Sequence, residues 1–457
     1  MATPTKPGRP SRPGRRARFV AGSAKAGADT AGYLDDRLGL GRWLRPNLRK
    51  LFPSHWSFLL GELALYSFVM LVLTGTFLTL FYKPNPDVAF ASVWEISREI
   101  RGGLLMRQLH HWSATVFVLS IVAHLCRVYF TGAFRKPREL TWMLGVLLFG
   151  LALFESFLGV SLQADPLAYA GLRQAQGLLL SVPLVGTYLS AFVFDGAFPG
   201  NVIPRLFVTH VLLVPGILLA VVPLHALILT WRQKHTERRA TGDERRVTGG
   251  PFFPYFAVKN GATALFTIAV ISLLATFVMV NPFWRQEPGA LSSTPPSAQP
   301  FWYSGVLDGA LRLVPGWEIE IGGYPLMVGL WIPMLILGGF FTVLFCYPFL
   351  ERRFTGDTRY HHLLDRPSQA PVRTALGFAV ITFFLVLWAP MWVSELPPVM
   401  RSAPAFPGQP PPVPPALLTV PHDGYVLIIT VLRVAVFVLP PLAYAVALAV
   451  CRRRSRT

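Results

Sequence analysis

The sequence predicts an all-α polytopic membrane protein with eight transmembrane helices. Its 457 residues are 53% hydrophobic and only 14% charged, with a mean hydropathy of +0.46, which is far more apolar than an ordinary soluble domain. Apolar stretches long enough to cross a bilayer recur along the chain. The expected spans cover about 56–82, 109–131, 141–163, 205–231, 260–284, 326–348, 373–395 and 424–450.

The distribution of basic residues supports this topology. The net charge of +19 could indicate nucleic-acid binding, but 31 of the Lys and Arg residues lie in the first 55 residues, in alternate loops and in the tail. The remaining loops hold nine. Because cytoplasmic loops of membrane proteins carry such an excess, both termini are expected in the cytoplasm, and nucleic acid is not an expected partner.

The chain divides into three expected parts. Residues 1–55 lack the apolar core of a signal peptide and are expected to form a basic, largely disordered cytoplasmic segment. Residues 56–231 contain the first four spans, which are expected to form a four-helix bundle. Residues 232–457 contain the other four spans and a long outer loop at 285–325.

Four histidines lie in the second and fourth spans at matched spacing. His110 and His124 are 14 residues apart, and His210 and His225 are 15 apart. At about 100° per residue, both separations return near the same helix face, whereas the 13 residues from His111 to His124 miss that face by about 140°. His110, rather than His111, therefore shares a face with His124.

Because both spans run from the outside inward, each histidine of one can face a histidine of the other. His110 would face His210 near the outer surface, and His124 would face His225 near the inner surface. The two levels would be roughly 21–23 Å apart along the helix axes. Two bis-histidine levels in a helical bundle suit two haems. A proton relay or separate transition-metal sites are the alternatives, since this distance excludes one shared ion. The fourth span could absorb its extra residue by bending at Pro215, Gly216 and Pro223.

Glycines in the first and third spans repeat the register. Gly61 and Gly75 are 14 residues apart, as are Gly145 and Gly159. Glycine lets a large planar group approach the backbone, although it is also a common packing residue in membrane helices. Because these spans run outward, Gly61 and Gly145 are expected at the inner level, and Gly75 and Gly159 at the outer level.

These histidines and glycines, in this order, resemble the cytochrome b subunit of cytochrome bc complexes, the quinol–cytochrome c reductases. The stretches "RQLHHWSA", "HLCRVYFTGAFRKPRELTW" and "PRLFVTHVLLVPG" look most like the actinobacterial, menaquinol-oxidising branch. The resemblance implies a low-potential outer b-type haem on His110 and His210, and a high-potential inner b-type haem on His124 and His225. It also implies haem propionates near Arg107, Arg127 and Arg205.

The resemblance further implies an activity and a setting. Quinol, here menaquinol, would be oxidised at an outer site in a bacterial plasma membrane. One electron would pass to a Rieske iron–sulfur protein and the other through both haems to an inner quinone, coupled to proton translocation. A cytochrome c subunit, membrane lipids and a second copy of the complex are the other implied partners.

The outer quinol site departs from the family pattern. Where the family has Pro-Glu-Trp-Tyr or an Asp variant, this chain reads Pro300, Phe301, Trp302 and Tyr303, so a ring without a lone pair replaces the carboxylate. The family's Gly-Tyr-Ser-Leu-Pro stretch reads "GVSLQAD" here. The loop acids that could substitute, and that equally fit solvated loop charges, are Asp165, Glu287, Asp308 and Glu318.

The inner quinone site is less defined, and three functions stay open. Its candidates, which also fit cytoplasmic-edge charges, are Arg232, His235, Lys259 and Asn260. His361 and His362 receive no role. The leading function is the di-haem subunit of the reductase. The alternatives are a divergent di-haem electron-transfer subunit without bifurcated quinol oxidation, and a transporter or scaffold that binds no haem.

Overall fold

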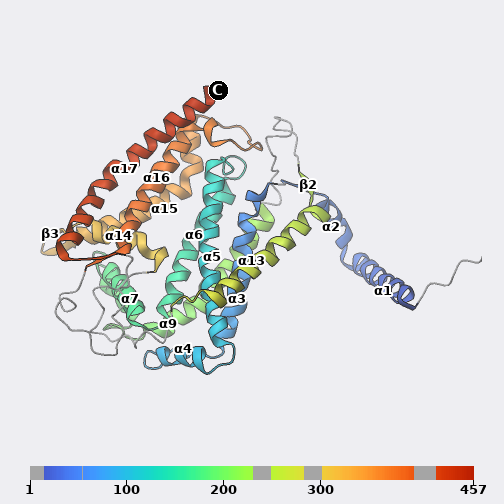
Figure 1. Ribbon diagram of the computed structural model, residues 1–457, viewed down its shortest axis with the longest axis horizontal. Helices are drawn as coiled ribbons and strands as arrows, with labels where there is room; N and C mark the ends of the chain where they lie inside the picture. The colour runs from blue at the N-terminus through green and yellow to red at the C-terminus, as the bar shows by residue number, and fades with distance from the viewer. Residues whose placement is uncertain (1–14, 54, 230–248, 282–300, 396–417, 457) are drawn as a thin grey trace, which may run out of the picture.

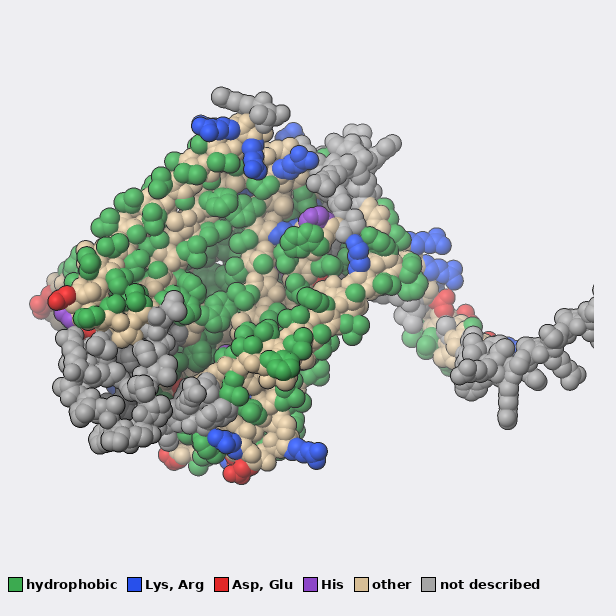
Figure 2. Space-filling view, in the orientation of Figure 1, with side chains coloured by type: hydrophobic (Ala, Val, Ile, Leu, Met, Phe, Trp, Pro, Cys, Tyr) green, Lys and Arg blue, Asp and Glu red, His purple; other side chains and the backbone are tan. Residues whose placement is uncertain are grey.

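The computed structural model describes residues 15–53, 55–229, 249–281, 301–395 and 418–456. Within these residues, eight helices are long and apolar enough to cross a membrane, which confirms the expected number of spans. Figure 2 shows hydrophobic side chains across the middle of the visible face and Lys and Arg toward its two ends. The chain is therefore a multi-pass membrane protein. The spans are Trp56–Thr79, Gly103–Phe130, Glu139–Ser161, Val202–Ala226, Phe252–Phe277, Val328–Thr355, Pro371–Trp392 and His422–Arg454.

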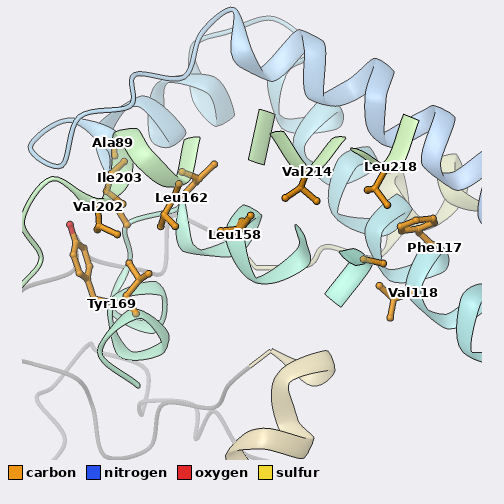
Figure 3. Close-up of a cluster of buried hydrophobic side chains, with 14 of the residues drawn as sticks. Ala89, Phe117, Val118, Leu158, Leu162, Tyr169, Val202, Ile203, Val214 and Leu218 are labelled. Atoms are coloured by element: carbon orange, nitrogen blue, oxygen red, sulfur yellow. The ribbon is translucent and has the colours of Figure 1, made fainter. Parts of the chain in front are cut away.

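The first four spans form a helical bundle at the centre of the molecule (Figure 1). Helix α3 packs against α5, α5 against α6, and α6 against the fourth span. Apolar side chains from all four, such as Phe68, Phe117, Leu158 and Leu218, share one buried core, part of which is drawn in Figure 3. The segments are η1 (Trp56–Leu59), α3 (Leu60–Thr79), α5 (Gly103–Phe130), α6 (Glu139–Ser161), α9 (Val202–Val208), η2 (Thr209–Leu213), α10 (Val214–Pro223) and η3 (Leu224–Leu229).

Short helices cover the end of the bundle where the fourth span begins. They are α4 (Ala89–Arg98), α7 (Pro166–Leu180) and α8 (Gly186–Phe194). Helix α7 begins where it does because Asp165 accepts a hydrogen bond from the amide of Ala168 at 2.7 Å, which is the role of an N-cap. Tyr169 of α7 then packs with the start of α9 in the shared core (Figure 3).

The remaining spans lie on two sides of the bundle. Helix α13 packs against α3 and α5, while α14, α16 and α17 pack together and α15 also reaches α6. The described residues form three two-stranded sheets: β1 with β2 and β3 with β4 are antiparallel, and β5 with β6 is parallel. The helices are η4 (Phe252–Phe256), α13 (Ala257–Phe277), η6 (Trp302–Ser304), α14 (Gly305–Leu313), α15 (Val328–Thr355), η7 (Pro367–Gln369), α16 (Pro371–Trp388), η8 (Ala389–Trp392) and α17 (His422–Arg456). The strands are β1 (Leu51–Phe52), β2 (Gly250–Pro251), β3 (Glu318–Ile321), β4 (Tyr324–Met327), β5 (Val393–Glu395) and β6 (Leu418–Val420).

The N-terminal segment differs from the expectation of a largely disordered stretch over 1–55. Its described part contains α1 (Arg15–Leu38) and α2 (Leu40–Leu48), which project away from the bundle in Figure 1. Alanine, arginine and leucine favour helix strongly enough to outweigh the low hydrophobicity of this stretch. Gly39 separates the two helices because its φ of 62° is left-handed.

A buried ionic cluster joins the bundle to the second half of the chain. Arg373, at the start of α16, is 5% exposed and contacts Glu351 of α15 at 2.8 Å and Asp365 at 2.5 Å. Asp365 also pairs with Arg135, from the loop between α5 and α6, at 2.8 Å. This cluster therefore ties the loop between α5 and α6 to residues 351–373, which lie more than 200 residues later in the sequence.

Candidate functional site

The outer pair of histidines lies between α5 and the fourth span. The ring centroids of His110 and His210 are 6.3 Å apart, with the ring planes at 81°. Each ring faces a glycine on a neighbouring helix. A Cβ at Gly75 would lie 3.2 Å from Cε1 of His110, and one at Gly159 would lie only 2.7 Å from Cε1 of His210. A side chain at Gly159 would therefore collide with the His210 ring, and one at Gly75 would press closely on the His110 ring.

The inner pair repeats this arrangement at the other end of the bundle. A Cβ at Gly61 would lie 3.3 Å from Cε1 of His124, and one at Gly145 would lie 3.2 Å from Cε1 of His225. The two histidines lie close enough to interact electrostatically. Each of the four histidines thus faces the glycine that the 14-residue register places at its level.

The fourth span accommodates its longer histidine spacing by widening, not only by bending. His210 lies in the π-helical turn η2, and His225 lies in a second π-helical segment, η3. A π-turn adds a residue without a matching advance along the helix, and it often marks a functional site. Pro215 and Pro223 cannot donate to the carbonyls four residues earlier, which explains why regular α-helix is interrupted here.

The second ring nitrogens of these histidines have different partners. Nδ1 of His110 lies 3.0 Å from the hydroxyl of Thr74, and Nδ1 of His210 lies 2.9 Å from Oε1 of Glu155. The ring of His225 interacts with the backbone of Thr141. A partner on Nδ1 fixes the tautomer and leaves Nε2 as the metal-binding nitrogen. Glu155 was not among the residues that the sequence singled out.

The aromatic motif of the outer loop lies against the end of the bundle that holds His110 and His210. Tyr303 donates a hydrogen bond to the carbonyl of Ser156 in α6 at 3.0 Å, and its burial raises its pKa well above the usual value, so the hydroxyl stays protonated. Its ring stacks on Phe301 at 5.9 Å. The carbonyl of Trp302 accepts from Nε1 of Trp388 at 2.7 Å. Pro300 lies outside the described residues.

Comparison with known proteins decides the family. The cytochrome b subunit of the cytochrome bc1 complex of Streptomyces coelicolor is 43% identical over 385 residues, covering 80% of this chain and 70% of that protein. The chain belongs to the cytochrome b subunits of bc1 complexes. The subunit from Mycobacterium leprae is also 43% identical, over 374 residues that cover 78% and 68% of the two chains. The family model "Cytochrome b(N-terminal)/b6/petB" matches residues 115–288 of this cytochrome b.

A solved structure has the same fold. A chain of a "Hyperthermophilic respiratory Complex III" superposes with a TM-score of 0.68, covering 92% of this chain and 99% of that one at 21% identity. The agreement extends over both halves of the chain, so it supports the all-α polytopic fold as a whole.

The residues of this cytochrome b fit the b-type haems that its family implies. The outer pair of imidazoles lies with its ring centroids 6.3 Å apart, so His110 and His210 would be able to hold one iron between them. Imidazole pairs are suitable axial donors. The Nδ1 of His124 is buried and without a hydrogen-bond partner among the described residues.

The three arginines that the resemblance placed near propionates have different surroundings. Arg127 lies with its guanidinium 3.7 Å from the centroid of the Phe58 ring, and its Nε and Nη2 are buried without a hydrogen-bond partner among the described residues. Arg107 donates to the carbonyl of Asn281 at 3.1 Å. Arg205 instead pairs with Asp195 at 3.0 Å, and its side chain is 40% exposed. Arg127 is therefore the one best placed to meet a carboxylate.

Two of the loop acids are not solvated charges. Asp165 is 0% exposed and caps α7, and Asp308 pairs with Arg312 at 2.7 Å. Both are held by local partners, which the sequence pattern alone does not reveal. Glu318 is exposed on β3, as a solvated charge would be, and Glu287 lies outside the described residues.

The inner quinone candidates are only partly described. Lys259 lies with its ammonium 4.7 Å from the ring of Tyr255, and Oδ1 of Asn260 is buried without a partner among the described residues. His361, which received no role, is buried and its carbonyl accepts from Arg138 at 2.6 Å. It therefore belongs to the loop that carries the ionic cluster. Arg232 and His235 lie outside the described residues.

Proposed function

We propose that this chain is the di-haem cytochrome b subunit of a respiratory quinol–cytochrome c reductase. The observation that carries the proposal is the one-to-one pairing of four histidines with four glycines at two levels of one bundle. When bound, each haem supplies a one-electron carrier, and the two levels form a route across the membrane. The proposed iron ligands are His110 with His210 at the outer level and His124 with His225 at the inner level.

Other residues of the bundle complete the two proposed haem sites. Gly61, Gly75, Gly145 and Gly159 leave space beside the imidazoles, and Arg127 would pair with a propionate by charge-assisted hydrogen bonds. Residues 56–231 form the di-haem unit, and residues 232–457 supply the outer-loop motif and helices that pack on the bundle. The subunit would lie in a bacterial plasma membrane with both termini cytoplasmic, because its basic residues concentrate on one side.

The proposed substrate is a quinol, menaquinol in view of the actinobacterial relatives, bound outside near Tyr303. The protonated hydroxyl of Tyr303 and the Trp302 ring would orient it. Electrons would leave to a Rieske iron–sulfur protein and a cytochrome c subunit on one branch, and through both haem levels to an inner quinone on the other. Proton translocation, a homodimeric complex and bound lipids complete the proposal.

A second candidate function rests on Phe301. The described residues of the outer motif, 301–303, carry no carboxylate, and the acids nearby are engaged: Asp165 caps α7 and Asp308 pairs with Arg312. A quinol proton therefore has no carboxylate acceptor in the motif. In this candidate the chain is a di-haem electron-transfer subunit without bifurcated oxidation at the outer site.

Two measurements test these functions. A haem assay on the purified complex should give two b-type haems per chain, and a spectrum without a b-type alpha band would overturn both candidates and leave a transporter or scaffold. Menaquinol-dependent reduction of cytochrome c by the complex with its Rieske partner separates the two candidates. Activity that depends on Tyr303 supports the reductase, while two reducible haems without such activity support the second candidate.

A further inference from the structure

The two ligands proposed for the outer haem have unequal partners. Nδ1 of His110 meets the neutral hydroxyl of Thr74, which itself donates to the carbonyl of Met70 at 2.6 Å and so accepts from the ring. Nδ1 of His210 meets the carboxylate of Glu155. At the inner level, His225 meets a backbone group. Among the described residues, the outer level alone pairs a proposed ligand with an acid.

Glu155 is built into this position by the helix. It lies on α6 four residues before Gly159, so both face the same side of that helix, toward His210. Its side chain is 16% exposed, and that of His210 is 17% exposed. Its second oxygen, Oε2, is buried without a hydrogen-bond partner among the described residues. The contact that the carboxylate makes is therefore the one with the His210 imidazole.

An acid within a membrane span is costly and is usually functional. Glu155 makes no ion pair with Lys or Arg among the described residues, so helix packing does not account for it. A carboxylate in contact with Nδ1, here at 2.9 Å, raises the basicity of the other ring nitrogen. Such outer hydrogen bonding is one of the means by which a protein sets the potential of a haem.

We propose that Glu155 is a positioning residue that lowers the reduction potential of the outer haem through His210. The inference rests on the proposed di-haem function. The carboxylate fixes the imidazole with Nε2 toward the iron and adds negative charge beside it, which favours the ferric over the ferrous state. The outer haem thereby becomes the weaker oxidant of the two, and electrons move inward.

The test is a redox titration of both haems in the purified complex, followed by the alpha band. The two waves are assigned with His110→Ala and His124→Ala, each of which removes one haem. Glu155→Gln keeps the shape and an acceptor oxygen but removes the charge. In this variant the equilibrium constant for reduction of the outer haem should rise about tenfold, which raises its reduction potential by about 59 mV for one electron. The inner wave should not move.

Two further variants separate charge from packing. Phe154→Leu changes the neighbouring, exposed side chain of α6 and should leave both waves unchanged. Glu155→Asp keeps the charge and should retain the outer haem with a potential nearer to the wild type than that of Glu155→Gln. The low-spin ferric EPR signal of the outer haem should shift with Glu155→Gln alone.

The outcomes are distinct. Two haems with both potentials unmoved in Glu155→Gln would overturn the role of Glu155 and leave the proposed function intact. A wild-type complex without haem would overturn the function itself. If Glu155→Gln loses the outer haem, Glu155→Asp decides between the outcomes. An outer haem that is retained in Glu155→Asp with a low potential supports the proposal. Loss of that haem, or an upward shift of its potential by about 59 mV, contradicts it.

Discussion

The ring of Phe301 lies beside His111, with 6.4 Å between their centroids. The Phe301 ring also stacks with the ring of Tyr303 at 5.9 Å, with an interplanar angle of 10°. The residue that takes the place of the family's carboxylate therefore contacts both an imidazole and a phenol. His111 does not face a glycine as His110 does, and its described contact is with the outer-loop motif. The adjacent histidines thus belong to different sites.

Restoring the carboxylate should restore a proton acceptor at the outer site. In Phe301→Glu, the new group would lie near Tyr303, where it could accept a quinol proton. We expect the rate of menaquinol oxidation to rise by about tenfold or more, since general base groups contribute at least this much. The assay is cytochrome c reduction by the complex with its Rieske partner.

The matched control for this change is Phe301→Gln, because glutamine has nearly the same shape as glutamate and is also polar, but it has no basic carboxylate oxygen. It should leave the rate near that of the wild type. Equal rates in the Glu and Gln variants would show that the carboxylate adds nothing at this position.

Gly159 should be indispensable for the outer haem. Its Cβ would lie 2.7 Å from the His210 ring, so Gly159→Ala must displace the imidazole. We expect loss of the outer haem and retention of the inner one, measured by haem content and by the alpha band. The control is Gly150→Ala on the same helix, whose Cβ would meet Phe341 at an ordinary 3.7 Å. Two haems in both variants would contradict the pairing.

Removing the buried cation of the ionic cluster should destabilise the fold. Arg373→Ala would leave Glu351 and Asp365 without it, and breaking a buried pair costs about 3–5 kcal/mol of unfolding free energy. Arg359→Ala, which breaks an exposed pair with Asp357, should cost less than about 1 kcal/mol. Denaturation in mixed micelles followed by circular dichroism compares them. Equal losses would remove the special role of the cluster.

The capping carboxyl of α7 gives a pH dependence of defined sign. Burial raises the pKa of Asp165, so the folded chain keeps this proton to a higher pH than the unfolded chain, whose carboxyl titrates near about 4. Its contribution to stability therefore falls as the pH rises above that value.

Asparagine caps a helix about as well as aspartate, so Asp165→Asn isolates this effect. The stability of the variant relative to the wild type should increase from pH 4 to pH 8 in thermal unfolding. For comparison, Arg359 holds the pKa of Asp357 below its usual range, so Asp357→Asn should lose stability relative to the wild type above pH 4. A relative stability of Asp165→Asn that stays flat or falls would contradict the account.

Much of this architecture is readable from the sequence, because a bilayer imposes simple rules. Span length and the distribution of Lys and Arg predict the eight helices. The 100° advance per residue separates His110 from His111, and the 14-residue register predicts which glycine each imidazole faces. These features depend on helix geometry alone, which a single sequence specifies.

Other features depend on contacts between distant segments or on local competition. The prolines Pro215 and Pro223 predict a bend in the fourth span. They do not by themselves predict the π-helical turns that contain His210 and His225. The burial of Asp165 depends on α7 folding back over the bundle. Glu155 did carry a signal, as an acid within an apolar span four residues from Gly159, but its partner on the fourth span is known only from the fold.

Haem content of single histidine variants tests the central claim most directly. If the ligand pairs are as proposed, the complex with His110→Ala and the complex with His124→Ala each retain one b-type haem, and His111→Ala retains two. Loss of a haem in His111→Ala, with both retained in His110→Ala, would contradict the assignment on which the whole account rests.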